Sequence, residues 1–177
     1  TSSLSGARVL ELGAGVGIAG MLAARLRAAE VALTDGDACC VPLLAKSAKD
    51  NGLANVVAAR LLWGDAKSTA DECHTADAAA SGASPPPMPL FNVILAGDVL
   101  YKPDLIDPLL TTAAAFLAPR GTFLLCHIPR AGVTHDTVAA ALAAAGFAFE
   151  AHRPSGDGVR AEMCAEDAAR AMLYTAT

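Results

Sequence analysis

A glycine-rich loop directly after an apolar segment near the N-terminus constrains the fold of this chain more than any other feature. Gly13, Gly15 and Gly17 follow the apolar segment from Ala7 to Leu12 at alternate positions. An apolar stretch of helical length follows, from Ile18 to Ala29. Glycines at a strand-to-helix turn let a ligand approach the backbone closely, and the helix N-terminus then faces that ligand. The pattern therefore predicts a strand, a ligand-binding turn and a helix.

Strand-like and helix-like segments alternate along most of the chain after this loop. The alternation predicts an α/β fold, a Rossmann-like three-layer sandwich in which helices cover both faces of a mostly parallel sheet and ligands bind at the carboxyl ends of the strands. The last two strand candidates have no long helical pattern between them, so we expect them to pair antiparallel. The expected strands are Ala7 to Leu12, Val31 to Thr34, Val56 to Trp63, Phe91 to Ala96, Thr122 to Ile128, Phe147 to His152 and Ala171 to Thr175. The expected helices are Ile18 to Ala29, one from its cap Asp37 to Asn51 and Gly52, Asp104 to Leu117 with Pro119 and Gly121 as its stop, and Thr134 to Ala145 before Gly146.

The composition changes between residues 67 and 90, where Ala, Ser, Asp and Pro dominate. Three consecutive prolines, Pro85 to Pro87, exclude a regular helix or a central strand there. We therefore expect a flexible surface insert over residues 67–90, with any helix confined to its first half, about Ser68 to Ala80. A chain of 177 residues has the size of one domain, so residues 1–177 are expected to form a single domain.

Charge and composition limit the partners and the compartment. The net charge of −5 works against binding the phosphates of nucleic acids and favours a cationic peptide. The longest strongly apolar run, Val138 to Phe149, is shorter than the ~20 residues that cross a bilayer, and Thr1 to Gly6 contain no secretory signal. We expect no membrane partner and a cytoplasmic location, with the nucleus as the alternative. The cysteines are odd in number and lack C-x-x-C spacing, which predicts reduced thiols and no metal site: Cys39, Cys40, Cys73, Cys126 and Cys164.

An acidic residue two positions before the loop, Glu11, separates two cofactor interpretations. Gly15, Gly17 and Gly20 also match the G-x-G-x-x-G pattern of dinucleotide sites, so a nicotinamide-dependent oxidoreductase, NAD- or NADP-dependent, is one interpretation. A carboxylate would repel a pyrophosphate, whereas it attracts the ammonium of a methionine moiety by on the order of several kcal/mol before screening. Glu11 therefore favours S-adenosylmethionine as the cofactor.

Further candidates lie where the expected strands end. Asp35 ends the second strand, eighteen residues after Gly17, where a carboxylate accepts hydrogen bonds from ribose hydroxyls. Trp63 and Asp65 close the third strand and suit an adenine ring and its exocyclic amine, although a single tryptophan is also a common core residue. The histidines and the arginine of the loop from Cys126 through Arg130 to His135 are weaker candidates for lining a substrate channel, and a solvated loop is the simpler interpretation.

The fourth strand ends in Gly97 and Asp98, and Tyr101 follows three residues later. Both side chains are expected to emerge beside the donor methyl group. We hypothesise that Asp98 and Tyr101 accept hydrogen bonds from a substrate amine, aim its lone pair and help to exclude water. The alternatives are a turn cap for Asp98 and a core position for Tyr101.

Four motifs, in this order along the chain, resemble those of the seven-strand class I methyltransferases and, more narrowly, the family 16 lysine methyltransferase-like group. That group includes the enzymes acting on calmodulin, elongation factor 2, valosin-containing protein and Hsp70 chaperones, and the D-x-x-Y signature after the fourth strand is its most specific mark. The motifs are Val9 to Gly17, Leu33 to Asp37, Leu62 to Asp65 and Asp98 to Tyr101.

The resemblance implies a sheet of order 3-2-1-4-5-7-6 with an antiparallel last strand, S-adenosylmethionine as cofactor, and methylation of a lysine amine on a protein. It also implies that Gly13 to Gly15, including Ala14, contact the methionine portion of the cofactor. Asp35 would contact the ribose and Trp63 the adenine, while Gly97 with Asp98 would lie near the donor and the incoming amine.

Two departures from the resemblance are visible. Such enzymes usually have a covering segment before the first strand, and only Thr1 to Gly6 precede it here, so we expect that cover to be absent. This favours a second alternative, a non-catalytic methyltransferase-like domain that binds a protein partner. Ala96 and Gly97 stand where Gly-Ala is common, and we expect that small change to be tolerated. The oligomeric state does not follow from the sequence.

Overall fold

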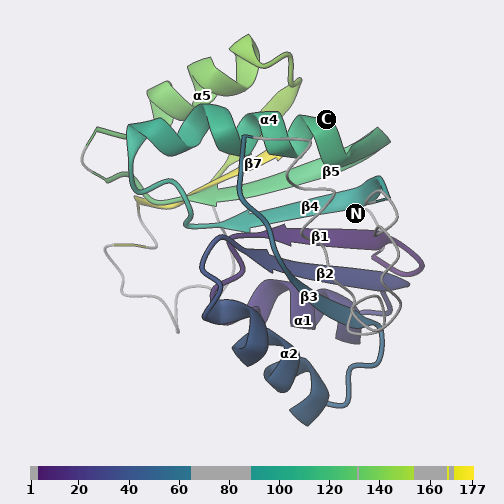
Figure 1. Ribbon diagram of the computed structural model, residues 1–177. Helices are drawn as coiled ribbons and strands as arrows, with labels where there is room; N and C mark the ends of the chain where they lie inside the picture. The colour runs from purple at the N-terminus through teal and green to yellow at the C-terminus, as the bar shows by residue number, and fades with distance from the viewer. Residues whose placement is uncertain (1–3, 65–88, 131, 154–166, 168–169) are drawn as a thin grey trace.

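The chain folds into a seven-stranded sheet with helices on both faces (Figure 1). This computed structural model describes residues 4–64, 89–130, 132–153, 167 and 170–177. The strand order is β3-β2-β1-β4-β5-β7-β6, in which β7 runs antiparallel to its neighbours β5 and β6 and the other pairs are parallel. The predicted α/β class, the sheet order and the antiparallel last strand are confirmed. The strands are β1 (Arg8–Leu12), β2 (Glu30–Asp35), β3 (Val56–Arg60), β4 (Phe91–Gly97), β5 (Leu117–His127), β6 (Phe149–His152) and β7 (Met172–Ala176).

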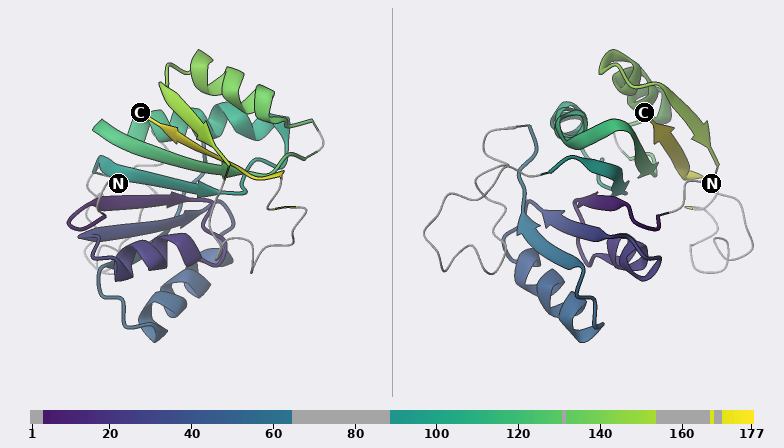
Figure 2. Two further views of the ribbon diagram at one scale, coloured as in Figure 1. Left: turned by 180° about the vertical axis from the view of Figure 1, so that it is seen from behind. Right: turned by 90° about the vertical axis from the view of Figure 1, so that its right-hand side faces the viewer.

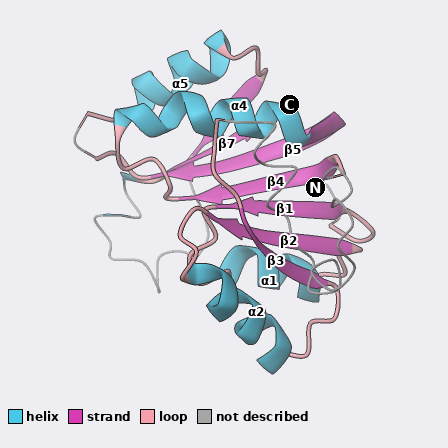
Figure 3. Ribbon diagram, in the orientation of Figure 1, coloured by secondary structure: helices cyan, strands magenta, loops and turns pink. Residues whose placement is uncertain are grey.

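Helices cover both faces of the sheet, as the views from the front, the back and the side show (Figures 1 and 2). Helices α1 and α2 lie on one face, against β1, β2 and β3, and α4 and α5 lie on the other. Figure 3 shows these helices on either side of the strands. A short 3-10 helix, η2, leads directly into α4. The helical elements are α1 (Ile18–Arg25), α2 (Cys40–Asp50), η2 (Pro103–Leu105), α4 (Ile106–Phe116) and α5 (His135–Ala144).

Successive residues of the central strands pack into two different cores, because side chains alternate between the faces of a sheet. Val9 of β1 and Leu33 of β2 belong to the core under α1 and α2. Leu10 and Leu12 of β1 belong to the core under α4 and α5, together with Ile94 of β4. β1 is therefore buried on both sides, as its nearly continuous apolar sequence predicts.

Helix α1 ends at Arg25, four residues before the predicted end at Ala29. Arg27 adopts a left-handed backbone conformation, with φ 68°. The N–H groups of Arg27 and Ala28 donate to carbonyls of the last helical turn at 3.2 and 3.1 Å, which is the Schellman arrangement that ends many helices. The sequence prediction was wrong here because an arginine occupies the turn position that glycine usually marks.

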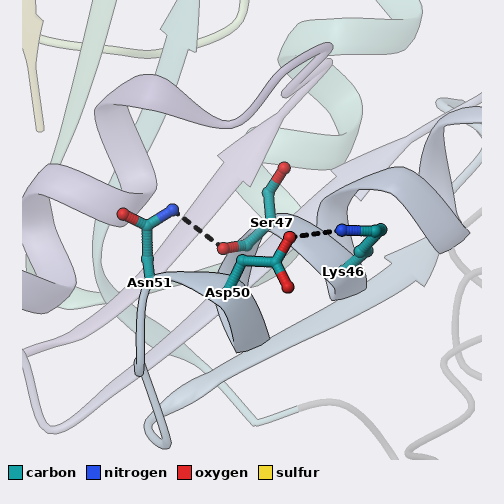
Figure 4. A network of polar contacts seen from close by, with 4 residues as sticks. All are labelled: Lys46, Ser47, Asp50 and Asn51. Carbon is teal, nitrogen blue, oxygen red and sulfur yellow. Dashed lines mark hydrogen bonds and ion pairs between the residues drawn. The ribbon is translucent and has the colours of Figure 1, made fainter.

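Helix α2 ends where Asn51 and Gly52 predict. The side-chain amide of Asn51 donates to the carbonyl of Ser47 at 2.9 Å, next to an ion pair between Lys46 and Asp50 (Figure 4). Gly52 has φ 65° and donates to the carbonyl of the last turn. The predicted cap Asp37 accepts from the N–H of Cys39 at 2.8 Å, in the turn just before the helix.

Two strand boundaries differ from the prediction. β5 begins at Leu117, five residues before the predicted start at Thr122, because Leu117 pairs with Phe91 before the ladder shifts register. β3 ends at Arg60 rather than at Trp63, since the chain leaves the sheet after Arg60 pairs with the last residue of β2. The segment after β3 is thereby free to line a cleft instead of continuing the sheet.

Several predictions fall outside the described residues. These include most of the insert at 67–90, the helix expected at about Ser68 to Ala80, and Asp65. Among the described residues, no helix has both the length and the apolar character needed to cross a membrane.

Candidate functional site

A cleft of about 630 Å³ opens at the carboxyl ends of β1, β2 and β4. The strand order reverses between β1 and β4, and open α/β sheets bind ligands at such a switch point. The volume lies within the range of small-molecule sites, about 300–1,000 Å³. Of the residues predicted from the sequence, the cleft brings together Gly13, Asp35, Trp63, Gly97, Asp98 and Tyr101.

Gly13 forms the floor of the cleft and tolerates no side chain. Its φ is 66°, a conformation that costs other residues about 1–2 kcal/mol. A Cβ atom would also lie 2.8 Å from Cγ1 of Val99 and 3.2 Å from the ring of Trp63. The loop glycine thus keeps the backbone exposed to whatever occupies the cleft.

Asp35 holds the loop and the start of the next turn with one carboxylate. Its Oδ2 atom accepts from the N–H of Gly15 at 2.9 Å, and its Oδ1 atom accepts from the N–H of Asp37 at 3.0 Å. A carboxylate offers about four acceptor sites, so Asp35 retains capacity for two further donors on the cleft side. Vicinal hydroxyls are donors of this kind.

Glu11 is not part of the cleft wall. It points to the same face of β1 as Val9, under helix α1, and is 6% exposed. Its Oε2 atom accepts from the N–H of Gly20 at 2.9 Å, and burial raises the pKa of its carboxyl to about 7. A Cβ atom on Gly20 would lie 2.6 Å from this oxygen. Glu11 therefore fastens helix α1 to the central strand.

Two other predicted residues of the loop also have packing roles. A Cβ atom on Gly17 would lie 2.7 Å from Cδ2 of Leu44 in α2, so this glycine allows helices α1 and α2 to approach each other. Ala14 is buried, and its N–H donates to the carbonyl of Thr34 at 2.8 Å. Neither Ala14 nor Gly17 lines the cleft, and Gly15 reaches it only through its bond to Asp35.

Trp63 forms one wall of the cleft. It follows β3, packs against the core under α4, and lines the cleft at the same time. The next residue, Gly64, donates to Oγ1 of Thr112 at 3.0 Å, which ties this segment to helix α4. Trp63 therefore packs against the core and also lines the cleft. The sequence left these two positions open as alternatives.

Asp98 and Tyr101 lie on the opposite side of the cleft, after β4. Asp98 has φ 53°, and its N–H donates to the carbonyl of Cys126 at 2.8 Å. Its Oδ2 atom forms an ion pair with Nη2 of Arg130. Tyr101 is 56% exposed at the rim, so it is not a core residue, and Nζ of Lys102 lies 6.0 Å from the centre of its ring.

The loop after β5 contributes one residue to this region. The ion pair of Arg130 with Asp98 raises the pKa of the guanidinium further, chiefly through their hydrogen bond. His127 is fully buried and lies edge-on to His135, with ring centres 5.5 Å apart. Burial lowers the pKa of His127, and neither histidine lines the cleft.

Some residues of the cleft were not among the site residues predicted from the sequence. Val99, Leu105 and Pro108 form apolar walls, and Asp37 lines the cleft as well as accepting a hydrogen bond in the turn before α2. The pairing of Asp98 with Arg130 could have been inferred, because both follow neighbouring parallel strands. Among the described residues, no group of His, Cys, Asp or Glu is arranged to hold a metal ion.

The sheet order and the cleft at its switch point define the class, which is that of the seven-stranded S-adenosylmethionine-dependent methyltransferases. The sequence profile of the lysine methyltransferase family matches residues 1–137, and the chain belongs to that family. This match decides between the two cofactor interpretations in favour of S-adenosylmethionine over a nicotinamide dinucleotide. A search of curated proteins by sequence gave no match.

Solved structures agree in fold at low sequence identity. An S-adenosylmethionine-dependent methyltransferase from Mesorhizobium loti matches 99% of this chain and 93% of its own, with a TM-score of 0.68 and 18% identity. A TehB-like methyltransferase from Corynebacterium glutamicum matches 98% and 80%, with a TM-score of 0.65 and 17% identity. The magnesium protoporphyrin IX methyltransferase from Synechocystis, solved with bound S-adenosylmethionine, matches 98% and 70%, with a TM-score of 0.63 and 17% identity.

Proposed function

We propose that this methyltransferase transfers a methyl group to a lysine amine on a protein substrate. One observation carries the proposal: the carboxylate of Asp98 and the exposed ring of Tyr101 open onto the cleft that Gly13, Asp35 and Trp63 line. The family name supports lysine as the acceptor. The net charge of −5 is compatible with a cationic protein segment and unfavourable for nucleic acid.

The residues of the cleft fit S-adenosylmethionine. The exposed backbone at Gly13 leaves room for the methionine portion, Asp35 has acceptors free for the ribose hydroxyls, and the ring of Trp63 offers a face to adenine. The cofactor supplies a methyl group on a sulfonium centre, which is transferred by in-line displacement. The protein's contribution is to hold the donor and the nucleophile about 3–3.5 Å apart.

Asp98 and Tyr101 act on the incoming amine in this proposal. A lysine side chain has a pKa near 10.4 and attacks only after it has lost a proton. The carboxylate of Asp98 accepts a hydrogen bond from the amine and aims its lone pair into the cleft, and the displaced proton passes to water at the open rim. Tyr101 and the apolar walls at Val99 and Leu105 reduce the access of water to the nucleophile.

Glu11 supports the cofactor site indirectly in this proposal, because it does not line the cleft. It fixes the start of helix α1 through Gly20, and the positive end of that helix follows the glycine loop. A negative charge below the loop also favours the ammonium of the methionine portion. Gly15 and Gly17 support the same loop, and Gly97 leaves space beside the donor.

The test is transfer of labelled methyl groups from S-adenosylmethionine to proteins of a lysate. We expect the wild type to label a lysine-bearing protein and Asp98→Ala to lose this activity, while the variant still binds S-adenosylhomocysteine in calorimetry. Asp104→Ala, an exposed acid on η2, is the matched control and retains labelling. Binding of S-adenosylhomocysteine by the wild type without any labelling would instead support the non-catalytic protein-binding alternative.

A further inference from the structure

At most one oxygen of the Asp98 carboxylate, Oδ2, is accessible to a ligand. Oδ1 is buried and has no hydrogen-bond partner among the described residues, and Oδ2 already accepts from Nη2 of Arg130. Rotation of the carboxylate about its own bond merely exchanges the two oxygens. An ammonium that approaches Oδ2 therefore meets the positive charge of Arg130, so the two cations compete for the same oxygen.

The carboxylate is the fixed partner of this ion pair. The N–H of Asp98 donates to the carbonyl of Cys126 at 2.8 Å, and a left-handed φ of 53° sets the direction of the side chain. Arg130 instead reaches Asp98 with a long side chain from the turn between β5 and α5. That turn is closed by hydrogen bonds of 3.1 and 3.0 Å between Arg130 and Val133, whereas the arginine side chain is 47% exposed. The guanidinium can thus swing into solvent without disturbing the backbone.

The pair also restricts what can replace the guanidinium. A partly buried carboxylate that loses its cation keeps an uncompensated charge, so a neutral or acidic group is a poor substitute. A protonated amine restores both the charge and the hydrogen bond. It can take the place of the guanidinium first and lose its proton to water afterwards.

We propose that Arg130 is a specificity-determining residue that occupies the open oxygen of Asp98 until a cationic amine displaces it. This inference rests on the proposed function, because it takes Asp98 as the group that receives the substrate amine. It extends that function by requiring the acceptor to arrive as a cation in competition with an arginine of the enzyme itself.

The test measures binding of n-butylammonium, the lysine side-chain analogue, to the full chain saturated with S-adenosylhomocysteine, by NMR titration. Arg130→Met removes the competitor and keeps much of its length, so we expect at least about threefold tighter binding than in the wild type. Lys102→Met is the matched control, because it removes another cation beside the cleft that contacts the ring of Tyr101 rather than Asp98. It should change the affinity much less, and Arg130→Lys should restore competition.

Two further measurements separate the inference from the proposed function. The neutral probe 1-pentanol should bind the wild type and Arg130→Met equally, since it does not replace a cation. Asp98→Asn should lose butylammonium binding, and the gain from Arg130→Met should vanish in the double variant. Equal or weaker butylammonium binding by folded Arg130→Met overturns the inference alone. Unchanged binding by Asp98→Asn instead removes Asp98 as the amine site and overturns the proposed function.

Discussion

Glu11 carries the largest electrostatic cost among the described residues of the central strand. Its carboxyl is buried beside helix α1, and its pKa rises from 4.5 to about 7 because water cannot reach the charge. A single N–H, that of Gly20, offsets part of this cost. Near neutral pH the residue is therefore poised between its neutral and charged forms.

We predict that the stability of the protein falls as the pH rises from about 4.5 to about 7 because of this residue. In that window the folded protein holds a proton on Glu11 that the unfolded chain has released, so a higher pH favours unfolding. At roughly 1.4 kcal/mol per pKa unit, the loss approaches 3 kcal/mol. Glu11→Gln cannot ionise and should lack this part of the pH dependence.

Urea unfolding at pH 5 and pH 8 measures this effect as the difference between the wild type and Glu11→Gln. Glu30→Gln, at the partly exposed first residue of β2, controls for the chemical change. An identical pH profile for the wild type and Glu11→Gln would mean that the folded protein keeps Glu11 charged. Bound S-adenosylmethionine should reduce the difference, because its ammonium favours the carboxylate.

At the scale of the elements, the sequence predicted a helix end correctly where a glycine follows the helix. Gly52 and Gly146 adopt left-handed conformations after α2 and α5, as glycines after a helix indicate, and both ends were predicted within one residue. Arg27 adopts the same conformation after α1, but an arginine does not indicate a left-handed conformation as a glycine does. The predicted helix therefore ran on to Ala29.

We predict that Arg27→Gly stabilises the protein. The arginine pays a steric cost of about 1 kcal/mol for its φ of 68°, whereas glycine adopts that conformation freely. Gly146→Ala places a methyl group at the equivalent position after α5, where no atom lies within 4 Å, and should destabilise by a similar amount. Thermal unfolding should move in opposite directions for the two variants, and a fall for Arg27→Gly would contradict the prediction.

The candidate site was predictable to the extent that strand ends meet at one edge of a parallel sheet. That rule places Asp35, Trp63 and Asp98 around one cleft. It does not say on which face of its strand Glu11 lies, and the alternation along β1 turns that side chain under α1. It places Arg130 at the same edge, after the neighbouring strand β5, but the ion pair with Asp98 also depends on the course of the turn that carries Arg130.

At the scale of the molecule, the cleft joins two halves of the sheet, with β1 to β3 on one side and β4 to β7 on the other. A ligand that contacts Asp35 and Asp98 together therefore binds the folded state alone. We predict that S-adenosylhomocysteine at about 100 times its Kd stabilises the protein by about 2.7 kcal/mol. For a chain of this size, that raises the Tm by roughly 5–10 °C.

Differential scanning fluorimetry with and without the ligand measures this shift. Asp35→Ala removes the acceptor of the Gly15 N–H and the proposed acceptor of the ribose hydroxyls, and should abolish most of the shift at the same ligand concentration. Asp50→Ala, on the exposed end of α2, should retain it. The single tryptophan, Trp63, lines the cleft, so its emission should change with the ligand as well. A full shift in Asp35→Ala would exclude Asp35 from the ligand contacts.

The alternation of β1 between two apolar layers has a consequence for how such a chain tolerates insertions and deletions. Loss of a single residue within Arg8–Leu12 would invert the orientation of every side chain on one side of the break. Leucines would then face the small residues of α1, and the carboxylate of Glu11 would enter the opposite layer without the N–H of Gly20. We therefore expect insertions or deletions in β1 to prevent folding. Changes to this strand in an engineered protein should be limited to substitutions.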